Sequence, residues 1–267
     1  MESRNPVFNR SGEFKRGGYA TFDTRTPSAT DLEGMYAAPS ATPVQTGRMT
    51  LDDVVVRTAT LFAVLLATAA ATFFVWQPTN PLPVFGAAIV GFVLALVISF
   101  QRTVRPPLMI AYAAIEGVFV GGISYFYGMQ FGMDIVPQAV LGTLAAFGTM
   151  LALYKTGVVR NSPRFRKTLI IAAVGYLVFG VLNLLLSAFT GWTNVYAQGG
   201  LLPIVISAFG VVLASFFLVL DFDFVEQGIK NGLPQQFAWT AAFGLVVTLV
   251  WLYLEILRLL AILRGND

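Results

Sequence analysis

Long apolar runs recur along most of this chain, and they constrain its fold more than any other feature of the sequence. A bilayer core about 30 Å thick is crossed by a helix of about 20 apolar residues, since each residue adds about 1.5 Å. The runs lack the polar alternation of barrel strands. Seven spans are predicted, at residues 58–75, 84–100, 108–127, 135–153, 168–189, 202–220 and 237–263. The predicted fold is an all-α membrane protein, a bundle of seven transmembrane helices.

The composition supports this class and excludes several others. Charged residues make up 12% of the 267 residues, about half the share in ordinary soluble domains. Cysteine and histidine are both absent, which removes disulfides, thiolate or imidazole metal sites and histidine-dependent catalytic triads. We therefore expect no enzyme activity, no resident cofactor and no nucleic-acid partner, and the lipid bilayer as the main surroundings.

Residues 1–50 differ from the rest of the chain, being rich in Ser, Thr, Pro, Gly and Arg. They show no apolar periodicity and have too little apolar surface to offset the entropy of folding, so we expect a disordered tail. No apolar run follows the first charges closely enough for a secretory signal. The predicted organisation is a tail at 1–50 and a transmembrane domain at 51–267.

The basic residues predict the orientation of the spans, because Lys and Arg accumulate in cytoplasmic loops. Of the 17 basic residues, 15 lie in the tail up to Arg57 or in the second, fourth and sixth loops, and the other loops have none. We therefore expect the N-terminus in the cytoplasm and the C-terminus outside. Arg264, at the far end of the last span, is an exception that leaves a re-entrant last segment as the alternative.

Small residues are frequent in the predicted spans, and Gly117 and Gly121 form a GxxxG face in the third. Such faces let two helix backbones approach closely. We interpret this face as a packing surface of the bundle rather than as a site for a lipid or a substrate.

Three ionisable residues lie inside the spans: Glu116 in the third, and Glu255 and Arg258 in the seventh. They are candidates for function, because an acid at the centre of a bilayer costs about 2.5–3.5 kcal/mol. Glu255 and Arg258 are spaced i, i+3 and can neutralise each other as an ion pair. Glu116 has no partner in its own helix, so it is expected either as a hydrogen-bonded neutral acid or as a functional group facing the bundle interior.

A second group of acids, Asp221, Asp223 and Glu226, follows the sixth span, on the same predicted side of the membrane as Arg102 and Arg105. Acids beside a span end are usually only solvated. An exposed Asp–Arg contact would be worth about 0–1 kcal/mol, but a partly buried one can act as a gate that acid weakens. Asp221, Asp223, Arg102 and Arg105 are therefore candidate pH-sensor and gate residues.

Two runs of the sequence, VWLYLEILRLL at 250–260 and LDFD at 220–223, resemble motifs of the Bax inhibitor family. The first is similar to the family's last-helix motif, with Glu255 at its acidic position. The second is similar to the motif that closes the sixth helix, with Asp221 at its first aspartate. The resemblance covers about residues 50–264 and implies a bacterial member in the inner membrane. It also implies a central seventh helix and a pH-sensitive pair, Asp221 with Glu255, that gates a calcium leak beside Arg105.

The residues themselves leave two carboxylate pairs open. The predicted spans place Asp221 at the inner surface and Glu255 beyond mid-membrane, so these two meet only if the helix boundaries differ from those predicted. Glu116 lies near the depth of Glu255 and is the other candidate partner. Because Ca²⁺ takes oxygen ligands, Asp221 and Glu255 are also candidate Ca²⁺ contacts.

The favoured function is a passive, pH-modulated leak for Ca²⁺, gated by carboxylates of the sixth and seventh helices. The alternative is a membrane regulator that transports nothing, such as a modulator or substrate of a membrane quality-control protease. The resemblance implies this role for some bacterial members, and a flexible tail suits partner binding. Two-aspartate proteolysis is the one realistic enzyme activity, and the Gly-x-Gly-Asp motif that would accompany it is missing.

Overall fold

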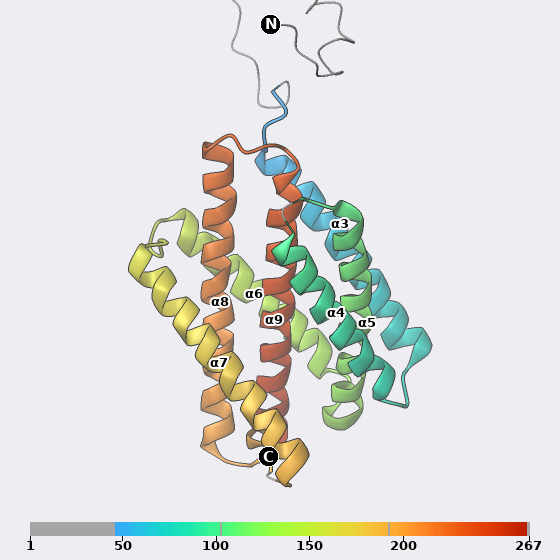
Figure 1. Cartoon of the computed structure of the whole chain (residues 1–267). Helices are drawn as coiled ribbons and strands as arrows, with labels where there is room; N and C mark the ends of the chain where they lie inside the picture. Colours follow the sequence, from blue (N-terminus) through green and yellow to red (C-terminus); the bar gives the residue numbers. More distant parts are fainter. Residues whose placement is uncertain (1–45, 102, 192, 266–267) are drawn as a thin grey trace, which may run out of the picture. The chain divides into compact units, whose positions relative to one another are not determined.

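Seven helices long and apolar enough to cross a membrane make up the described part of the chain (Figure 1). The computed structural model describes residues 46–101, 103–191 and 193–265. The helices are α3 (Leu51–Ala70, continued by the π-helical turn η2, Ala71–Trp76), α4 (Leu82–Phe100), α5 (Pro106–Phe131), α6 (Ile135–Lys155), α7 (Pro163–Thr190), α8 (Leu201–Lys230) and α9 (Phe237–Gly265), with a 3₁₀ turn, η3 (Val195–Ala197), before α8. All seven predicted spans are confirmed. The predicted disordered tail, up to residue 45, and Arg102 lie outside the described residues.

The sixth transmembrane helix, α8, runs ten residues past its predicted end at residue 220 and finishes at Lys230. The acidic residues of α8 do not end the helix, because two of them contact polar side chains one turn further along it. Gln227 Nε2 donates to Asp223 Oδ2 at 2.6 Å, and Glu226 forms an ion pair with Lys230. Asp221 therefore lies well inside the helix rather than at its end.

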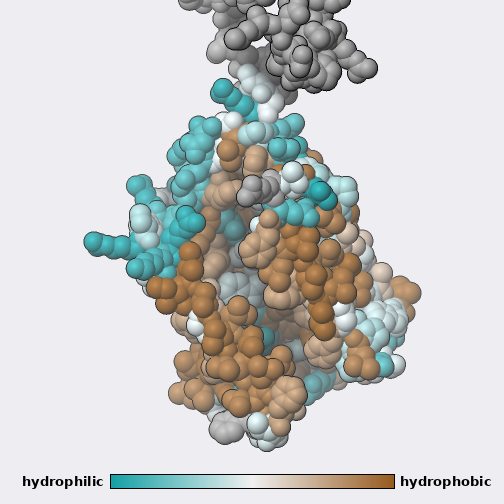
Figure 2. Space-filling view, in the orientation of Figure 1, coloured by the Kyte–Doolittle hydropathy of each residue, from teal (hydrophilic) through white to brown (hydrophobic). Residues whose placement is uncertain are grey.

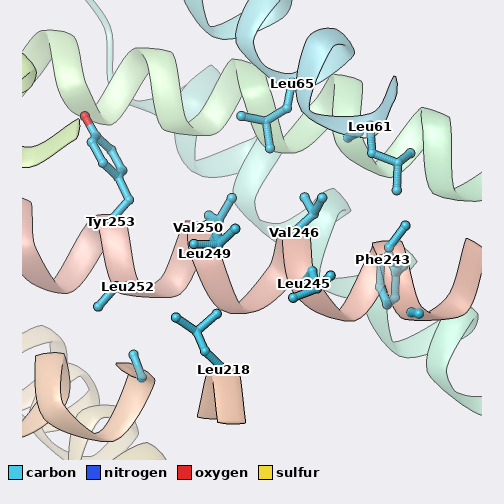
Figure 3. Close-up of a cluster of buried hydrophobic side chains, with 14 of the residues drawn as sticks. Leu61, Leu65, Leu218, Phe243, Leu245, Val246, Leu249, Val250, Leu252 and Tyr253 are labelled. Atoms are coloured by element: carbon cyan, nitrogen blue, oxygen red, sulfur yellow. The ribbon is translucent and has the colours of Figure 1, made fainter. Parts of the chain in front are cut away.

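The last helix, α9, lies at the centre of the bundle, as predicted (Figure 1). In an apolar stretch of 18 residues, 56% of the residues of α9 are buried, whereas only 11% are buried in the corresponding stretch of α7. Leu61 and Leu65 of α3 pack against it from one side and Leu218 of α8 from another (Figure 3). Residues placed on α9 are thus shielded from lipid by their neighbours, whereas α7 exposes most of its length.

The predicted GxxxG face joins α5 to α3. A Cβ added at Gly121 would lie 2.3 Å from the backbone oxygen of Ala69, and one at Gly117 would lie 2.3 Å from that of Leu65. Real side chains never come so close to a backbone, so only glycine permits this approach. The interpretation of this face as a packing surface is confirmed.

The two ends of the bundle differ in polarity, with hydrophilic side chains gathered at one end and a hydrophobic belt below them (Figure 2). The start of α3 lies at the hydrophilic end beside the α8–α9 turn. The backbone N–H of Met49 donates to Leu233 O at 2.7 Å, and Gln235 Nε2 donates to Asp53 Oδ1 at 2.7 Å. We call this end, which also includes the α4–α5 and α6–α7 connections, the basic end.

Arg264 lies at the other end and is anchored there. α9 is a continuous helix of 29 residues, about 43 Å long, so the last segment spans the bundle rather than re-entering. Arg264 donates to Asp134 at 2.9 and 2.5 Å and to Phe131 O at 2.8 Å, which ties the end of α9 to the α5–α6 turn. The one basic residue that disagreed with the charge pattern therefore has a structural partner.

This Arg264–Asp134 contact should not respond to pH in the physiological range. Hydrogen bonds from Arg264 hold the pKa of the Asp134 carboxyl below its usual range. A lowered folded-state pKa gives stability that is present above the unfolded-state pKa of about 3.9 and is lost only as the pH falls through the folded value. Asp134→Asn should thus lower the melting temperature in detergent equally at about pH 5 and about pH 8. A difference between the two pH values would contradict this assignment.

Candidate functional site

The candidate acids are placed by two antiparallel helices, α8 and α9, whose register fixes their depths. A Cβ added at Gly210 of α8 would lie 2.6 Å from Glu255 Oε2, and one added at Gly244 of α9 would lie 3.4 Å from Asp221 Oδ1. Asp221 follows Gly210 by eleven residues, and Glu255 follows Gly244 by eleven. At about 1.5 Å per residue, the two carboxyl groups are therefore about 16 Å apart along the helix axes.

Asp221 faces a cavity of about 390 Å³ at the basic end. We call it the Asp221 cavity; its polar lining is Ser99, Gln101, Thr103, Arg105, Asp221 and Thr240. Asp221 Oδ2 is buried and has no hydrogen-bond partner among the described residues. Arg105 shares the cavity, yet the ion pairs of the described residues do not join it to Asp221. The structure thus brings two predicted gate residues together without a direct contact.

The other two acids of α8 point away from this cavity. Asp223 Oδ2 accepts from Asn161 Nδ2 at 2.7 Å, in the connection between α6 and α7. Glu226 accepts from Tyr154 of α6 and pairs with Lys230. Asp223, predicted as a gate residue together with Asp221, lies outside the described lining of the Asp221 cavity and contacts the α6–α7 connection.

Glu255 is the centre of a second polar cluster, in the half of the bundle away from the basic end. Its side chain is 3% exposed, and Arg258 Nη1 lies 3.1 Å from Oε2, so the predicted i, i+3 ion pair is formed. Tyr176 of α7 donates its hydroxyl to the same oxygen at 2.9 Å, and Trp251 Nε1 donates to Oε1 at 3.1 Å. The guanidinium of Arg258 also lies 4.6 Å from the ring centre of Tyr196. The carboxylate is thus fully partnered.

Tyr196 is held over Arg258 by a hydrogen-bonded connection between α7 and α8. Asn183, buried in α7, donates to Asn194 Oδ1 at 2.9 Å and accepts from the backbone N–H of Val195 at 3.1 Å. Asn194 Oδ1 also accepts from the backbone N–H of Tyr196 at 3.0 Å. Sequence reasoning did not single out Asn183 or Asn194. Asn183 alone offered a signal, as a polar residue inside an apolar span.

Glu116 is buried in α5 and points toward α4, where a Cβ added at Gly91 would lie 2.6 Å from its Oε2. The position of Glu116 along the bundle axis follows from the packing of α5 on α9. The ring centres of Tyr112 and Phe243 are 5.0 Å apart, so these two residues lie at the same level. Glu116 is four residues beyond Tyr112, whereas Glu255 is twelve beyond Phe243. The two acids are therefore separated by about 12 Å in depth.

Comparison with known proteins assigns the chain to a family. The sequence model of the family described as Bax inhibitor 1 like matches residues 5–265, nearly the whole chain. The chain belongs to the Bax inhibitor 1 like family. The match also takes in most of the N-terminal segment, beyond the part of the chain that the short motifs covered. A search of curated proteins finds no match.

In this Bax inhibitor 1 like protein, neither predicted carboxylate pair is formed. Asp221 and Glu255 stay apart because α8 is unbroken and its register on α9 sets them three turns from each other. Glu116 does not meet Glu255 because its carboxyl group points toward α4. Nor can Asp221 and Glu255 share one Ca²⁺, whose ligands lie at about 2.3–2.6 Å. Among the described residues, no group of three or more acids is placed to hold a metal ion.

Proposed function

We propose that this Bax inhibitor 1 like protein is a pH-modulated leak pathway for cations, Ca²⁺ in particular, whose entrance at the basic end is the Asp221 cavity. The observation that supports the proposal is the buried, unpartnered Asp221 Oδ2 on a cavity with a polar lining. An ionisable residue inside a membrane bundle is costly and is usually kept for function. Glu255, in contrast, forms an ion pair with Arg258, and we assign it a structural role.

The cavity offers the chemistry that a hydrated divalent cation requires. The hydroxyl and amide groups of Ser99, Gln101, Thr103 and Thr240 supply oxygen atoms, and these are the ligands Ca²⁺ takes. The positive-inside rule assigns the basic end to the cytoplasm. Cations would then meet Asp221 first on the cytoplasmic side.

Arg105 supplies the response to pH. An ionised Asp221 attracts the guanidinium across the cavity, and a contact between them narrows the entrance; protonation of Asp221 removes this attraction. Among the described residues that line the cavity, Arg105 is the one cation and Asp221 is the one acid. On α9, the neighbours of the carboxyl group are Gly244 and Thr248, which have no charge. Acid should therefore open the pathway.

The test is Ca²⁺ flux in liposomes that contain only this protein, measured between about pH 8 and about pH 6. Because one proton changes the equilibrium at most about tenfold per pH unit, wild-type flux should rise as the pH falls over this range, by no more than about 100-fold. Asp221→Asn, which cannot ionise, should give flux that is nearly independent of pH. The matched control is Asp223→Asn, on the same helix, which removes a carboxylate outside the cavity and should leave the pH response within about twofold of wild type.

Several outcomes would contradict the proposal. One is the absence of flux at every pH in protein shown to be folded, which would favour a regulator that transports nothing. Another is a full pH response in Asp221→Asn, or its loss in Asp223→Asn. Arg105→Gln should resemble Asp221→Asn, because either change removes the attraction across the cavity.

A further inference from the structure

A groove of about 500 Å³ lies at the basic end, between the start of α7 and the end of α8. We call it the α7 groove; its lining includes Ser162, Arg166, Lys167, Ile170, Ile171 and Gln227. The groove is separate from the Asp221 cavity, whose lining comes from α4, α5, α8, α9 and the α4–α5 connection. The proposed leak pathway makes no use of it.

The lining of the α7 groove changes from cationic to apolar along the helix. Arg166 and Ile170 are spaced i, i+4, as are Lys167 and Ile171, so each basic side chain stands one turn from an apolar one on the same face. Ile170 is 44% exposed and Ile171 is 62% exposed. Figure 2 shows the same order on a larger scale, with hydrophilic side chains beside the α6–α7 connection and hydrophobic ones directly below.

The apolar part of the groove continues as an exposed stripe along α7. Val174, Val178 and Leu182 follow Ile170 at intervals of four residues, and all three are exposed. The stripe from Ile170 to Leu182 is about 18 Å long, roughly the length of an extended phospholipid acyl chain. The packed bundle leaves this stripe uncovered, since α7 buries few of its residues.

The positive charges of the groove are not neutralised within the described part of the protein. Neither Arg166 nor Lys167 belongs to any of its ion pairs. Asp223 accepts hydrogen bonds from Asn161 and Gln227, two residues of the groove lining, at 2.7 and 2.6 Å. The two side chains are thus available to a negatively charged group that is not part of this chain.

We propose that the α7 groove binds an anionic phospholipid, with the headgroup phosphate at Arg166 and Lys167 and an acyl chain along the stripe that begins at Ile170. A phosphate at the level of the basic side chains, with hydrocarbon below it, reproduces the cationic-to-apolar order of the groove. The start of α7 is not itself the binding element, because the Ser162 hydroxyl already accepts from the backbone N–H of Phe165 at 3.2 Å. This proposal does not depend on the leak function.

The experiment is native mass spectrometry of the purified, delipidated protein in detergent, titrated with phosphatidylglycerol or with phosphatidylcholine. The test variant is Arg166→Gln/Lys167→Gln. Its matched control is Lys155→Gln/Arg164→Gln, which removes one Lys and one Arg from the same end outside the groove; these two side chains are exposed. Since each basic side chain near an anionic lipid contributes about a fivefold gain in affinity, the test variant should bind its first phosphatidylglycerol about 30-fold more weakly than wild type.

The expected result has three parts: a preference of wild type for phosphatidylglycerol over phosphatidylcholine, its loss in the test variant, and retention in the control within about threefold. Equal weakening in both variants would show a general effect of charge and would overturn the proposal. Equal binding of the two lipids by wild type would also overturn it. Displacement of phosphatidylglycerol by an excess of inorganic phosphate would assign the groove to a soluble anion instead of a lipid. Melting temperatures close to wild type establish that both variants are folded.

Discussion

Replacing Arg258 by Leu should destabilise the folded bundle by about 3–5 kcal/mol, because it leaves the Glu255 carboxylate buried without its counter-charge. Glu255 is 2% exposed. After the change, the hydroxyl of Tyr176 and the indole N–H of Trp251 are the remaining donors to its carboxylate. The measurement is the free energy of unfolding in mixed detergent micelles, compared with wild type at neutral pH.

A double-mutant cycle separates loss of the ion pair from loss of packing. Glu255→Gln should cost less than Arg258→Leu, since Arg258 is 30% exposed and keeps its contact with the Tyr196 ring. The combination Glu255→Gln/Arg258→Leu should be more stable than Arg258→Leu alone, because the second change removes the unpaired charge. If the two single costs simply add in the double variant, Glu255 and Arg258 do not stabilise each other.

Replacing Gly121 by Ala should destabilise the protein by about 3 kcal/mol, at the upper end of what overpacking costs. The new Cβ would lie 2.3, 2.8 and 2.9 Å from three backbone atoms of Ala69. Backbone atoms cannot rotate out of the way, so α3 and α5 must separate and lose the packing along their contact. The measurement is again the free energy of unfolding in detergent.

The matched control is Gly175→Ala in α7, where the new Cβ would meet nothing within 4 Å. Here the gain in helix propensity, at most about 1 kcal/mol, should leave the protein as stable as wild type or slightly more stable. Similar losses of stability in Gly121→Ala and Gly175→Ala would contradict the close α3–α5 contact.

The seven spans were predictable because each depends on the composition of about 20 consecutive residues. The ends of the helices were not, because they depend on single side-chain contacts. Asp223 and Glu226 were read as the end of the sixth span, but their partners one turn later, Gln227 and Lys230, continue the helix to residue 230. The same contacts decide which of the three acids is free to face a cavity.

Sequence reasoning found the part of the Glu255 cluster that is local in the chain and missed the rest. The spacing of Glu255 and Arg258 on one helix predicts their ion pair, and the structure confirms it. Tyr176 lies 79 residues away in sequence, and its contact depends on how α7 crosses α9. Asp221 and Arg105 were predicted as neighbours and do share a cavity. Whether Asp221 and Arg105 form an ion pair depends on the positions of their side chains, and spacing in the sequence does not determine these positions.

The register of α8 against α9 limits how the protein can respond to protons. Helices in switching proteins typically shift by about 1–2 Å, and the largest ratchets move one element past another by a single turn of about 5.4 Å. Bringing Asp221 to Glu255 would require a slide of about three turns, past the close approach of Gly210 to the Glu255 carboxylate. A proton taken up at one acid can therefore reach the other only by relay through intermediate groups or water. Asp221 and Glu255 are thus two separate sites rather than a single shared one.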